Sequence, residues 1–404
     1  MSVHGTFRFH PIGQGLFYSG ILMKKDGRHN HQFSFVYDCG TDSPREFLWD
    51  EIDRFKLLLK KTGPKDTKKL DLLIVSHLHD DHVNGLERLL DGVEVDTVVM
   101  PYLSDGLSFM ARLESSYDEA FLQSFYLDPV AWFESKGVRR ILLLGADEEI
   151  IKSEGNNRMQ RRDKEDDLSI SHDSILMTEE NGEAELVYLK NSTILSSATF
   201  YWQFYFENLP VQKMGNYVHT VEAYLRQNCL TLSQVLASRT RVQELRKSLN
   251  RSFGGSGIAI NRTSVVLLHN PGKSYQTTSW IPSIAPVCHK YFSYKECFFL
   301  RYTILTGDIE LKDNETISVL SNKDRSTYET LLQYPHHGAS QCRFDELALD
   351  SLICVVSCGI TNKYGHPDPH ILRRFHPVEL VNERHSFDYE IFAEEESNSA
   401  SAVW

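Results

Sequence analysis

The chain lacks the sequence features of membrane and secreted proteins. No run of residues approaches the roughly eighteen uninterrupted apolar positions of a membrane-spanning helix. Residues 1–9 hold no charged segment followed by an apolar one, so we expect no secretory signal peptide. The seven cysteines are odd in number and scattered, and most lie in apolar runs, which is typical of reduced core residues. These absences predict a cytoplasmic protein with no membrane partner.

The chain also has fewer basic residues than acidic residues. The 404 residues include 43 Lys and Arg against 55 Asp and Glu, and the formal net charge is −12. This balance argues against capture of nucleic acid by the whole surface, although a local basic groove is compatible with it. The hydrophobic fraction of 41% is ordinary for a globular protein, and the length suits two average domains or one large domain with insertions.

The chain does hold a dense group of metal-ligand side chains. The sequence SHLHDDHVNG, residues 76–85, directly follows the apolar run 72–75. In an extended stretch His77 and His79 point the same way, and a turn at Asp81 and His82 brings a second pair alongside. Imidazole together with carboxylate suits Zn²⁺, Mn²⁺ or Fe²⁺ better than Ca²⁺ or Mg²⁺. The pattern therefore predicts two neighbouring divalent metal ions, Zn or Mn, that clamp and activate a water.

Two later segments supply further candidate ligands. The apolar run 303–305 leads into Gly307-Asp308, where the glycine lets the backbone turn sharply and the carboxylate projects from the strand end. Two adjacent histidines, His336 and His337, follow. One of them should complete the second metal site, and the other should lie behind it or contact substrate. The sequence does not decide which histidine takes which role.

A loop and a helix carry candidate substrate contacts. In the loop NKYGHP, residues 362–367, His366 would overhang the metals and bind substrate or act as general acid, with a structural His-Pro turn as the alternative. The expected helix 231–253 is rich in cations, of which Arg246 is a candidate for neutralising phosphates, unless the helix only presents a solvated face. The weaker substrate-binding candidates of the loop are Asn362, Lys363 and Tyr364.

Strand-like and helical patterns alternate along the chain, which favours a layered α/β fold. We expect residues 1–103 and 258–392 to form the two halves of one domain, with a last strand at 378–391. Residues 104–257 would be an insertion or cap, partly helical, with a flexible stretch near 151–168. Residues 393–404 would be a loose acidic tail.

Several motifs, taken together, resemble the metallo-β-lactamase superfamily of metal-dependent hydrolases, and in particular are similar to its ComEC-type hydrolase domain. The resemblance covers residues 1–103 and 258–390 and implies a four-layer αβ/βα sandwich with metals at the edge between two sheets. It also implies degradation of one strand of DNA. The motifs are GQG at 13–15, DCG at 38–40, the histidine-rich stretch at 77–85, NRTSVVL at 261–267, LTGDIE at 305–310, HHG at 336–338 and YGHP at 364–367.

The resemblance also implies roles for single residues. Asp308 would bridge both metals, and Asp38 would orient a ligand by hydrogen bonding around the metal loop. The chain departs from the family pattern at Asn261, which stands where most members have a third histidine for the first metal. An amide oxygen is a weaker and harder ligand than imidazole, so the first site should bind less tightly or favour Mn²⁺. His269, later on the same strand, is a poor substitute.

The function predicted from these motifs is that of a dinuclear phosphodiesterase or nuclease acting through a metal-bridging hydroxide. Asp81 and either His336 or His366 would take part in catalysis, and nucleic acid or another phosphodiester would be the substrate. The same ligands would also serve hydrolysis of a carboxylic ester, lactone or amide. A third possibility is an accessory protein whose segment 104–257 docks a partner protein. The sequence leaves the oligomeric state open.

Overall fold

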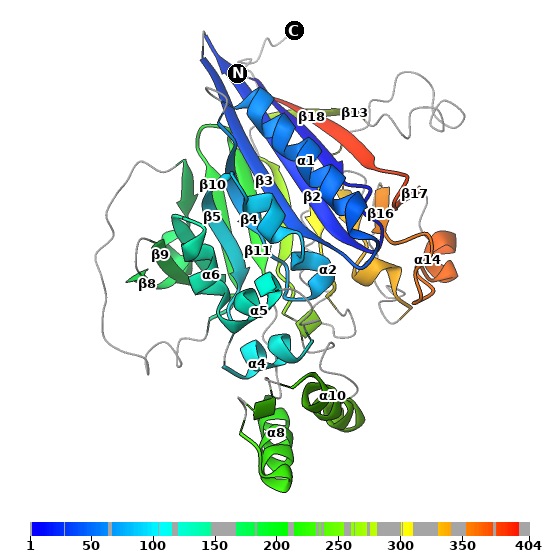
Figure 1. Ribbon diagram of the computed structural model, residues 1–404. Coiled ribbons are helices and arrows are strands. Elements are labelled where there is room, and N and C mark those ends of the chain that lie inside the picture. The colour runs from blue at the N-terminus through cyan, green and yellow to red at the C-terminus, as the bar shows by residue number, and fades with distance from the viewer. Residues whose placement is uncertain are drawn as a thin grey trace.

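Two β-sheets form the centre of the computed structural model (Figure 1). The strand order is β13-β18-β1-β2-β3-β4-β5-β6-β9-β8 in the first sheet and β17-β16-β15-β14-β12-β11-β10-β7 in the second. The structure describes residues 2–27, 29–63, 67–103, 105–114, 120–146, 167–181, 184–208, 214–231, 234–235, 238–253, 260–261, 263–272, 275–280, 300, 302–309, 330–340, 353–374 and 377–395.

The first sheet draws strands from both ends and from the middle of the chain, whereas all strands of the second sheet lie between Leu168 and Val381. The strands of the first sheet are β1 Ser2–Phe9, β2 Gly15–Asp26, β3 His29–Thr41, β4 Lys69–Ile74, β5 Glu94–Pro101, β6 Arg140–Leu144, β8 Ile175–Asn181, β9 Ala184–Leu189, β13 Tyr275–Trp280 and β18 Phe387–Glu395. Those of the second are β7 Leu168–Ile170, β10 Ser192–Ser197, β11 Trp202–Glu207, β12 Val266–Pro271, β14 Tyr302–Leu305, β15 Thr330–Gln333, β16 Ile353–Ser357 and β17 Val378–Val381.

Helices cover the outer faces of the sheets. They are α1 Arg45–Thr62, α2 Asp80–Val83, α3 Leu86–Leu90, α4 Asp105–Glu114, α5 Ala120–Leu127, α6 Pro129–Ser135, α8 Met214–Asn228, α10 Arg239–Phe253 and α14 Pro369–Arg374, with short 3₁₀ turns at η2 His172–Ser174 and η4 His336–Gly338. Helix α1 shows why such segments pack as they do. Its apolar residues Leu48, Ile52, Phe55 and Leu59 recur every three or four positions and are all buried. One stripe of the helix therefore faces the sheet.

Three hydrophobic clusters separate four layers. The first joins α1 and the helices α3 to α6 to the outer face of the first sheet. The second lies between the two sheets and contains the largest aromatic side chains, such as Trp202 and Phe35. The third joins α14, through Ile371, to the outer face of the second sheet. The predicted four-layer αβ/βα sandwich is thus confirmed.

The structure differs from the sequence-based expectations in several elements. The expected strand 378–391 is two strands in different sheets, β17 and β18, because the chain turns between Asn382 and His385. Strand β18 continues through Glu395, so the first residues of the expected acidic tail pair with β1, while 396–404 lie outside the described residues. Of the expected flexible stretch near 151–168, only Asp167 and Leu168 are described.

The segment 104–257 contributes to both sheets. Its strands β6, β8 and β9 extend the first sheet, and β7, β10 and β11 extend the second. Trp202, Phe204 and Phe206 of β11 are buried between the sheets. The helices α8 and α10 pack against each other beyond α4, at the end of the sandwich where α2 lies (Figure 1). Among the described residues, no helix is both long and apolar enough to cross a membrane.

Candidate metal centre

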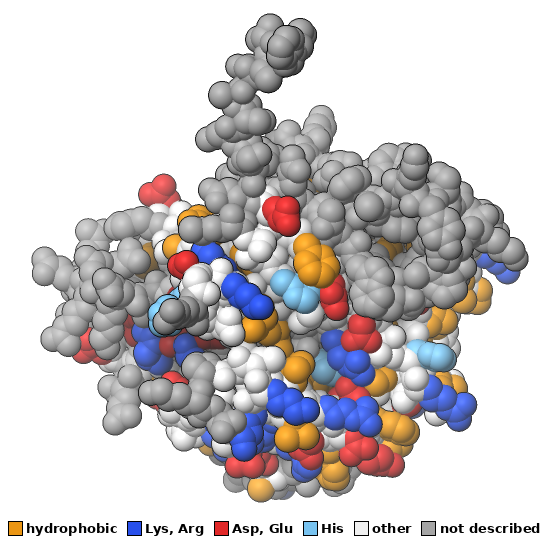
Figure 2. Space-filling model, turned by 90° about the horizontal axis from the view of Figure 1, so that it is seen from above, with side chains coloured by type: hydrophobic (Ala, Val, Ile, Leu, Met, Phe, Trp, Pro, Cys, Tyr) orange, Lys and Arg blue, Asp and Glu red, His pale blue; other side chains and the backbone are white. Residues whose placement is uncertain are grey.

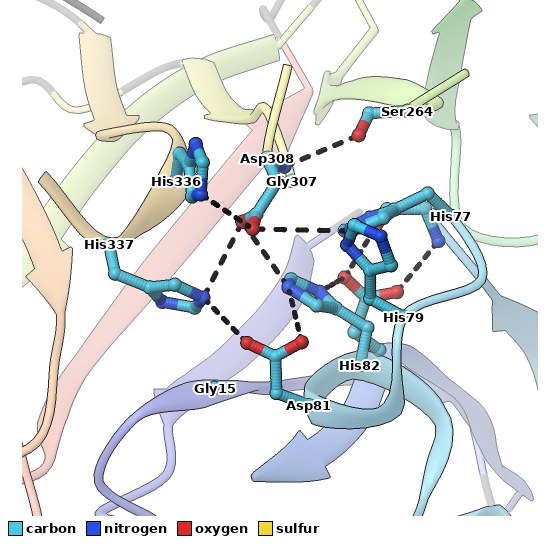
Figure 3. A network of polar contacts seen from close by, with 12 residues as sticks. Gly15, His77, His79, Asp81, His82, Ser264, Gly307, Asp308, His336 and His337 are labelled. Carbon is cyan, nitrogen blue, oxygen red and sulfur yellow. Dashed lines mark hydrogen bonds and ion pairs between the residues drawn. The ribbon is translucent and has the colours of Figure 1, made fainter. Parts of the chain in front are cut away.

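The chemistry-bearing side chains meet at one edge of the sandwich (Figure 3). Strands β3 to β6 run parallel in the first sheet, and β14 to β17 run parallel in the second. Because the carboxyl ends of parallel strands lie at one edge of a sheet, the segments that follow them come together there. Residues 76–82 follow β4, Asp308 follows β14, and the η4 turn follows β15.

Two glycines allow the backbone to approach closely at this edge. A Cβ atom on Gly40 would lie 2.5 Å from the backbone nitrogen of His82, so only glycine lets β3 pass under the metal loop. Gly307 has a φ of 56°, in the left-handed region that favours glycine, and a Cβ there would lie 2.9 Å from Ser76. The sharp turn expected before Asp308 is therefore present.

The structure gathers the predicted ligands into two groups that share one aspartate. Asp81, His82, Asp308 and His337 form one group, and His77, His79 and Asp308 form the other, each with its ligand atoms within 4.8 Å of one another. Asp308 Oδ1 lies 3.2 Å from His82 Nε2 and 3.6 Å from His337 Nε2. Its other oxygen, Oδ2, lies 4.0 Å from His77 Nε2. The carboxylate thus lies between the two groups.

Hydrogen bonds set the orientation of the imidazoles in the metal loop. Asp38 Oδ2 accepts from the Nδ1–H of His82 at 2.7 Å and from the Ser76 hydroxyl at 2.6 Å. Since the Ser76 hydroxyl has only one proton, His77 Nδ1, at 2.9 Å from that oxygen, must be the donor of its bond. In their neutral forms both rings therefore direct an Nε2 lone pair away from Asp38, toward Asp308.

The two adjacent histidines take different positions. His337 donates its Nδ1–H to the carbonyl of Ser357 at 2.9 Å, and its Nε2 lies 3.1 Å from Asp81 Oδ2. His336 is the more exposed of the two, and its Nε2 lies 3.9 Å from Asp308 Oδ2. His337 shares a group with Asp81 and His82, whereas His336 borders the open side of the site.

The centre favours positive charge. Burial would lower the pKa of His82, but the carboxylates of Asp308, Asp81 and Asp38 raise this pKa well above its ordinary value. Burial likewise opposes ionisation of Asp308, yet His337 and His82 hold the pKa of this carboxyl well below its usual range. Carboxylates held in the charged form inside a buried pocket attract cations.

The donor atoms fit divalent metal ions. Among the described residues, His82 Nε2, Asp308 Oδ1 and Asn261 Oδ1 are buried without a hydrogen-bond partner. Buried polar atoms are nearly always paired, and His82 Nε2 and Asp308 Oδ1, which face each other at 3.2 Å, need a proton or a cation between them. Imidazole nitrogen with carboxylate oxygen is a donor set for Zn²⁺ or Mn²⁺. These residues therefore meet the chemical requirement for the expected ions.

Asn261 and His269 lie in different parts of the structure. Asn261 starts the turn before Ser264, whose Oγ accepts from the backbone N–H of Asp308 at 3.3 Å, so this turn lies beside the metal loop. His269 is instead in the core between the sheets, where its Nε2 lies 2.8 Å from the Tyr18 hydroxyl. Burial lowers the pKa of His269 to about 3. His269 belongs to neither ligand group.

The loop after β16 borders a pocket of about 230 Å³ over the centre. His366 lines this pocket, and its ring lies 5.9 Å from that of His336. Burial, and then the neighbouring His337 and His336, lower the pKa of His366 to about 4. The Tyr364 hydroxyl also lines the pocket and donates to Asp42 Oδ2 at 2.9 Å.

Other candidate substrate contacts have different surroundings. The side chain of Asn362 bonds four backbone groups of its own loop, so it builds the loop that carries His366. Lys363 lies over the Tyr364 ring, with its Nζ 5.0 Å from the ring centre. Arg246 is half-buried in α10 and is not among the residues that line the pocket.

Sequence reasoning missed three residues that line the pocket, Gln14, Asp42 and Asp80. Gln14 accepts from the backbone N–H of Gly359 at 3.2 Å through Oε1, which leaves its Nε2 facing His366 Nδ1 at 3.5 Å. Asp42 lines the same pocket and accepts from Tyr364. Gln14 stands inside the GQG motif, which could have drawn attention to it, whereas Asp42 has no comparable signal.

The fold and the two His/Asp groups together indicate a metallo-hydrolase. Comparison with known families matches residues 28–134 to the metallo-beta-lactamase superfamily. The matched segment runs from β3 to α6 and includes the histidine-rich loop. A search of curated proteins found no match. The narrower likeness to the ComEC-type hydrolase domain stays a prediction.

Proposed function

We propose that this protein is a dinuclear metal-dependent phosphodiesterase that cleaves nucleic acid or nucleotides. The observation that carries the proposal is the pair of His/Asp groups joined by Asp308, with buried acceptors that lack hydrogen-bond partners among the described residues. Two metals at one carboxylate suit an in-line displacement, because one can activate the attacking oxygen while the other stabilises the negative charge that gathers on the leaving oxygen.

The two His/Asp groups support the following ligand roles. His77 and His79 would hold one ion, and Asp81, His82 and His337 would hold the other. Asp308 would contact both. Two Zn²⁺ or Mn²⁺ ions, when bound, would supply Lewis acidity and an activated water. Asp38 would keep His82 in the tautomer that presents Nε2, which is the usual task of a group behind a metal ligand.

His366 is our candidate for the group that assists the leaving oxygen. Because Gln14 presents its amide N–H to Nδ1, the proton of neutral His366 belongs on Nε2, free to donate to a substrate oxygen. Its place in the wall of the pocket beside His336 puts this donor near the metal centre. A phosphodiester, rather than a carboxylic ester, is favoured by the motif resemblance, since the ligand set would serve both.

The test is a comparison of substrates on metal-stripped protein. Mn²⁺, Zn²⁺ or Mg²⁺ would be added back, and hydrolysis measured with single- and double-stranded DNA, RNA, bis(p-nitrophenyl) phosphate and p-nitrophenyl acetate. We expect metal-dependent cleavage of phosphodiesters that His82→Ala abolishes. The matched control is His31→Ala, an exposed histidine of β3, which should leave the rate unchanged. Hydrolysis of the carboxylic ester alone would overturn the phosphodiester assignment.

A further inference from the structure

Helix α10 concentrates positive charge in a chain of net negative charge. Residues 239–253 hold five cations against one acid, a net of +4, whereas the whole chain carries −12. The one acid, Glu244, accepts a hydrogen bond from the Tyr224 hydroxyl of α8 at 3.2 Å. The cations are Arg239, Arg241, Arg246, Lys247 and Arg251.

A continuous set of contacts connects α10 to the metal loop. The Tyr126 hydroxyl of α5 donates to Asp80 Oδ1 at 2.9 Å, directly beside the ligand Asp81. Helix α5 packs against α4, and α4 packs against α10. Figure 1 places α10 below α4, at the end of the sandwich that carries α2. The basic helix is thus anchored on the same side of the fold as the candidate metal centre.

One side of α10 is buried and the other is open. Val242, Leu245 and Leu249 recur every three or four positions and pack in the same hydrophobic cluster as α4 and α5. Gln243 and Lys247, which fall on the opposite side of the helix, are exposed. A packing role explains the apolar stripe, but it does not explain the exposed Lys247 or the excess of cations in the sequence of this helix.

Charge elsewhere on the surface is distributed differently. On the opposite end of the sandwich, acidic and basic side chains are interspersed over the described surface (Figure 2). Like charges one helical turn apart, as at Lys247 and Arg251, weaken an isolated helix. A bound polyanion would convert this repulsion into attraction, and it would release its own counterions.

We propose that α10 binds the phosphodiester backbone of a nucleic-acid strand and holds it beside the metal centre. The proposal rests on the function proposed above and names its substrate as a polymer. A helix of 15 residues is about 22 Å long. That length spans roughly six nucleotides at 3.4 Å per phosphate. Small phosphodiesters would reach the metals without touching α10.

The primary test measures binding without cleavage. In the His82→Ala background, a labelled single-stranded DNA is titrated by fluorescence anisotropy at several salt concentrations. We expect the triple variant Arg239→Gln, Lys247→Gln, Arg251→Gln to bind at least tenfold more weakly. The slope of log K against log salt should fall by about 2, at about 0.7 per lost phosphate contact. Unchanged affinity and slope in the triple variant would overturn the proposal.

Two matched controls isolate charge and position. The conservative set Arg239→Lys, Lys247→Arg, Arg251→Lys keeps the charge and should bind like the parent. The set Lys25→Gln, Lys60→Gln, Lys61→Gln removes the same charge at the far ends of β2 and α1 and should also bind like the parent. The opposite result is that this second set binds as weakly as the α10 triple variant does. That result would show that only the net charge of the protein matters, and it would refute a specific role for α10.

A second measurement separates this inference from the proposed function. With the active enzyme, kcat/KM is compared for DNA and for bis(p-nitrophenyl) phosphate, and the DNA-to-diester ratio should fall about tenfold in the α10 triple variant. Cleavage of both substrates with an unchanged ratio would refute the role of α10 and leave the phosphodiesterase intact. DNA binding that depends on α10, without hydrolysis of either substrate, would support the role of α10 and refute the proposed phosphodiesterase activity. If the triple variant loses helix content by circular dichroism, the single variant Lys247→Gln at an exposed position replaces it. Its slope of log K against log salt then shows whether α10 contacts phosphates.

Discussion

Within the described part of the chain, two buried clusters of histidine and carboxylate differ in how completely their polar atoms are paired. In the first, His10 Nδ1 lies 2.9 Å from Glu51 Oε2 and His10 Nε2 lies 2.8 Å from the Ser19 hydroxyl. Glu51 also pairs with Arg54 at 2.6 Å and with Arg8 at 3.3 Å. In the second, at the metal centre, His82 Nε2 and Asp308 Oδ1 lack hydrogen-bond partners among the described residues.

The difference teaches that residue types alone do not identify a reactive site. His10, Ser19 and Glu51 have the composition and spacing of a nucleophilic triad. Ser19, however, lies inside β2, which pairs with β1 on one side and β3 on the other, so the neighbouring backbone N–H groups belong to the sheet. This cluster joins α1 to the first sheet. The cluster with unpaired acceptors is the one that calls for a ligand.

The largest expected effect is at the metal centre. His82→Ala should lower phosphodiester hydrolysis by roughly a thousandfold or more, because the metal site loses a ligand and with it several kcal/mol of transition-state stabilisation. The bound metal should fall from two ions toward one by elemental analysis. The metal-free variant should also lose some stability, because Asp38 no longer accepts the buried Nδ1–H bond of His82 at 2.7 Å, so circular dichroism is needed to show that it stays folded. A variant that keeps two ions and its full rate would contradict the assignment.

Mutation of the paired cluster should lower the stability of the fold and leave metal binding and turnover unchanged. Glu51→Ala removes the carboxylate that pairs with buried His10, while Arg8 keeps its pair with Asp388. Breaking a buried pair should lower the free energy of unfolding by roughly 3 kcal/mol. Metal content and turnover per folded molecule should be retained. Urea denaturation of the metal-free protein gives the stability. On the same helix, Asp53→Ala removes a surface pair with Arg88 and should cost less than about 1 kcal/mol. Equal losses of unfolding free energy in Glu51→Ala and Asp53→Ala would show that the buried cluster stabilises the fold no more than a surface ion pair does.

The pairing of Glu51 should also make the free energy of unfolding depend on pH. Burial opposes ionisation of Glu51, but His10, Arg8 and Arg54 lower its pKa to about 2, below the ordinary 4.5. A lowered pKa in the folded state contributes stability that is complete above pH 4.5 and lost as the pH falls toward 2.

Glu51→Gln should therefore flatten this part of the pH profile. The difference in unfolding free energy between wild type and variant should shrink on acidification by an amount on the order of 3 kcal/mol. Asp388, which also acts on His10, is present in both proteins and cancels from the comparison. Two parallel profiles, measured by urea denaturation of metal-free protein, would show that Glu51 does not titrate abnormally.

The smallest expected effect is at the rim of the metal pocket. Tyr364→Phe removes the hydrogen bond to Asp42, and one such bond contributes about 1 kcal/mol. We expect a loss of no more than about fivefold in kcat/KM, with metal content unchanged. Steady-state kinetics beside elemental analysis would check both quantities. A loss as large as that of His82→Ala would place Tyr364 among the groups that act on the reacting atoms.

The sequence alone was sufficient for features that depend on neighbours along the chain. The apolar run before His77 predicted a strand and a ligand-bearing loop, because burial and spacing are local properties of residues 72–82. Gly307 likewise predicted the sharp turn that orients Asp308. The four-layer sandwich came from a resemblance of motifs, and the three separate hydrophobic clusters confirm it.

Tertiary structure decided what depends on residues far apart in the sequence. The different positions of His336 and His337 depend on the carbonyl of Ser357 and on Asp81, which lies 256 positions from His337. The separation of β17 from β18 depends on pairing with β16 and β1 in different sheets. The pairing of His10 with Glu51, which distinguishes a structural cluster from a ligand site, spans 41 positions. Composition and spacing define which groups are available, but only packing determines which of them remain unpaired.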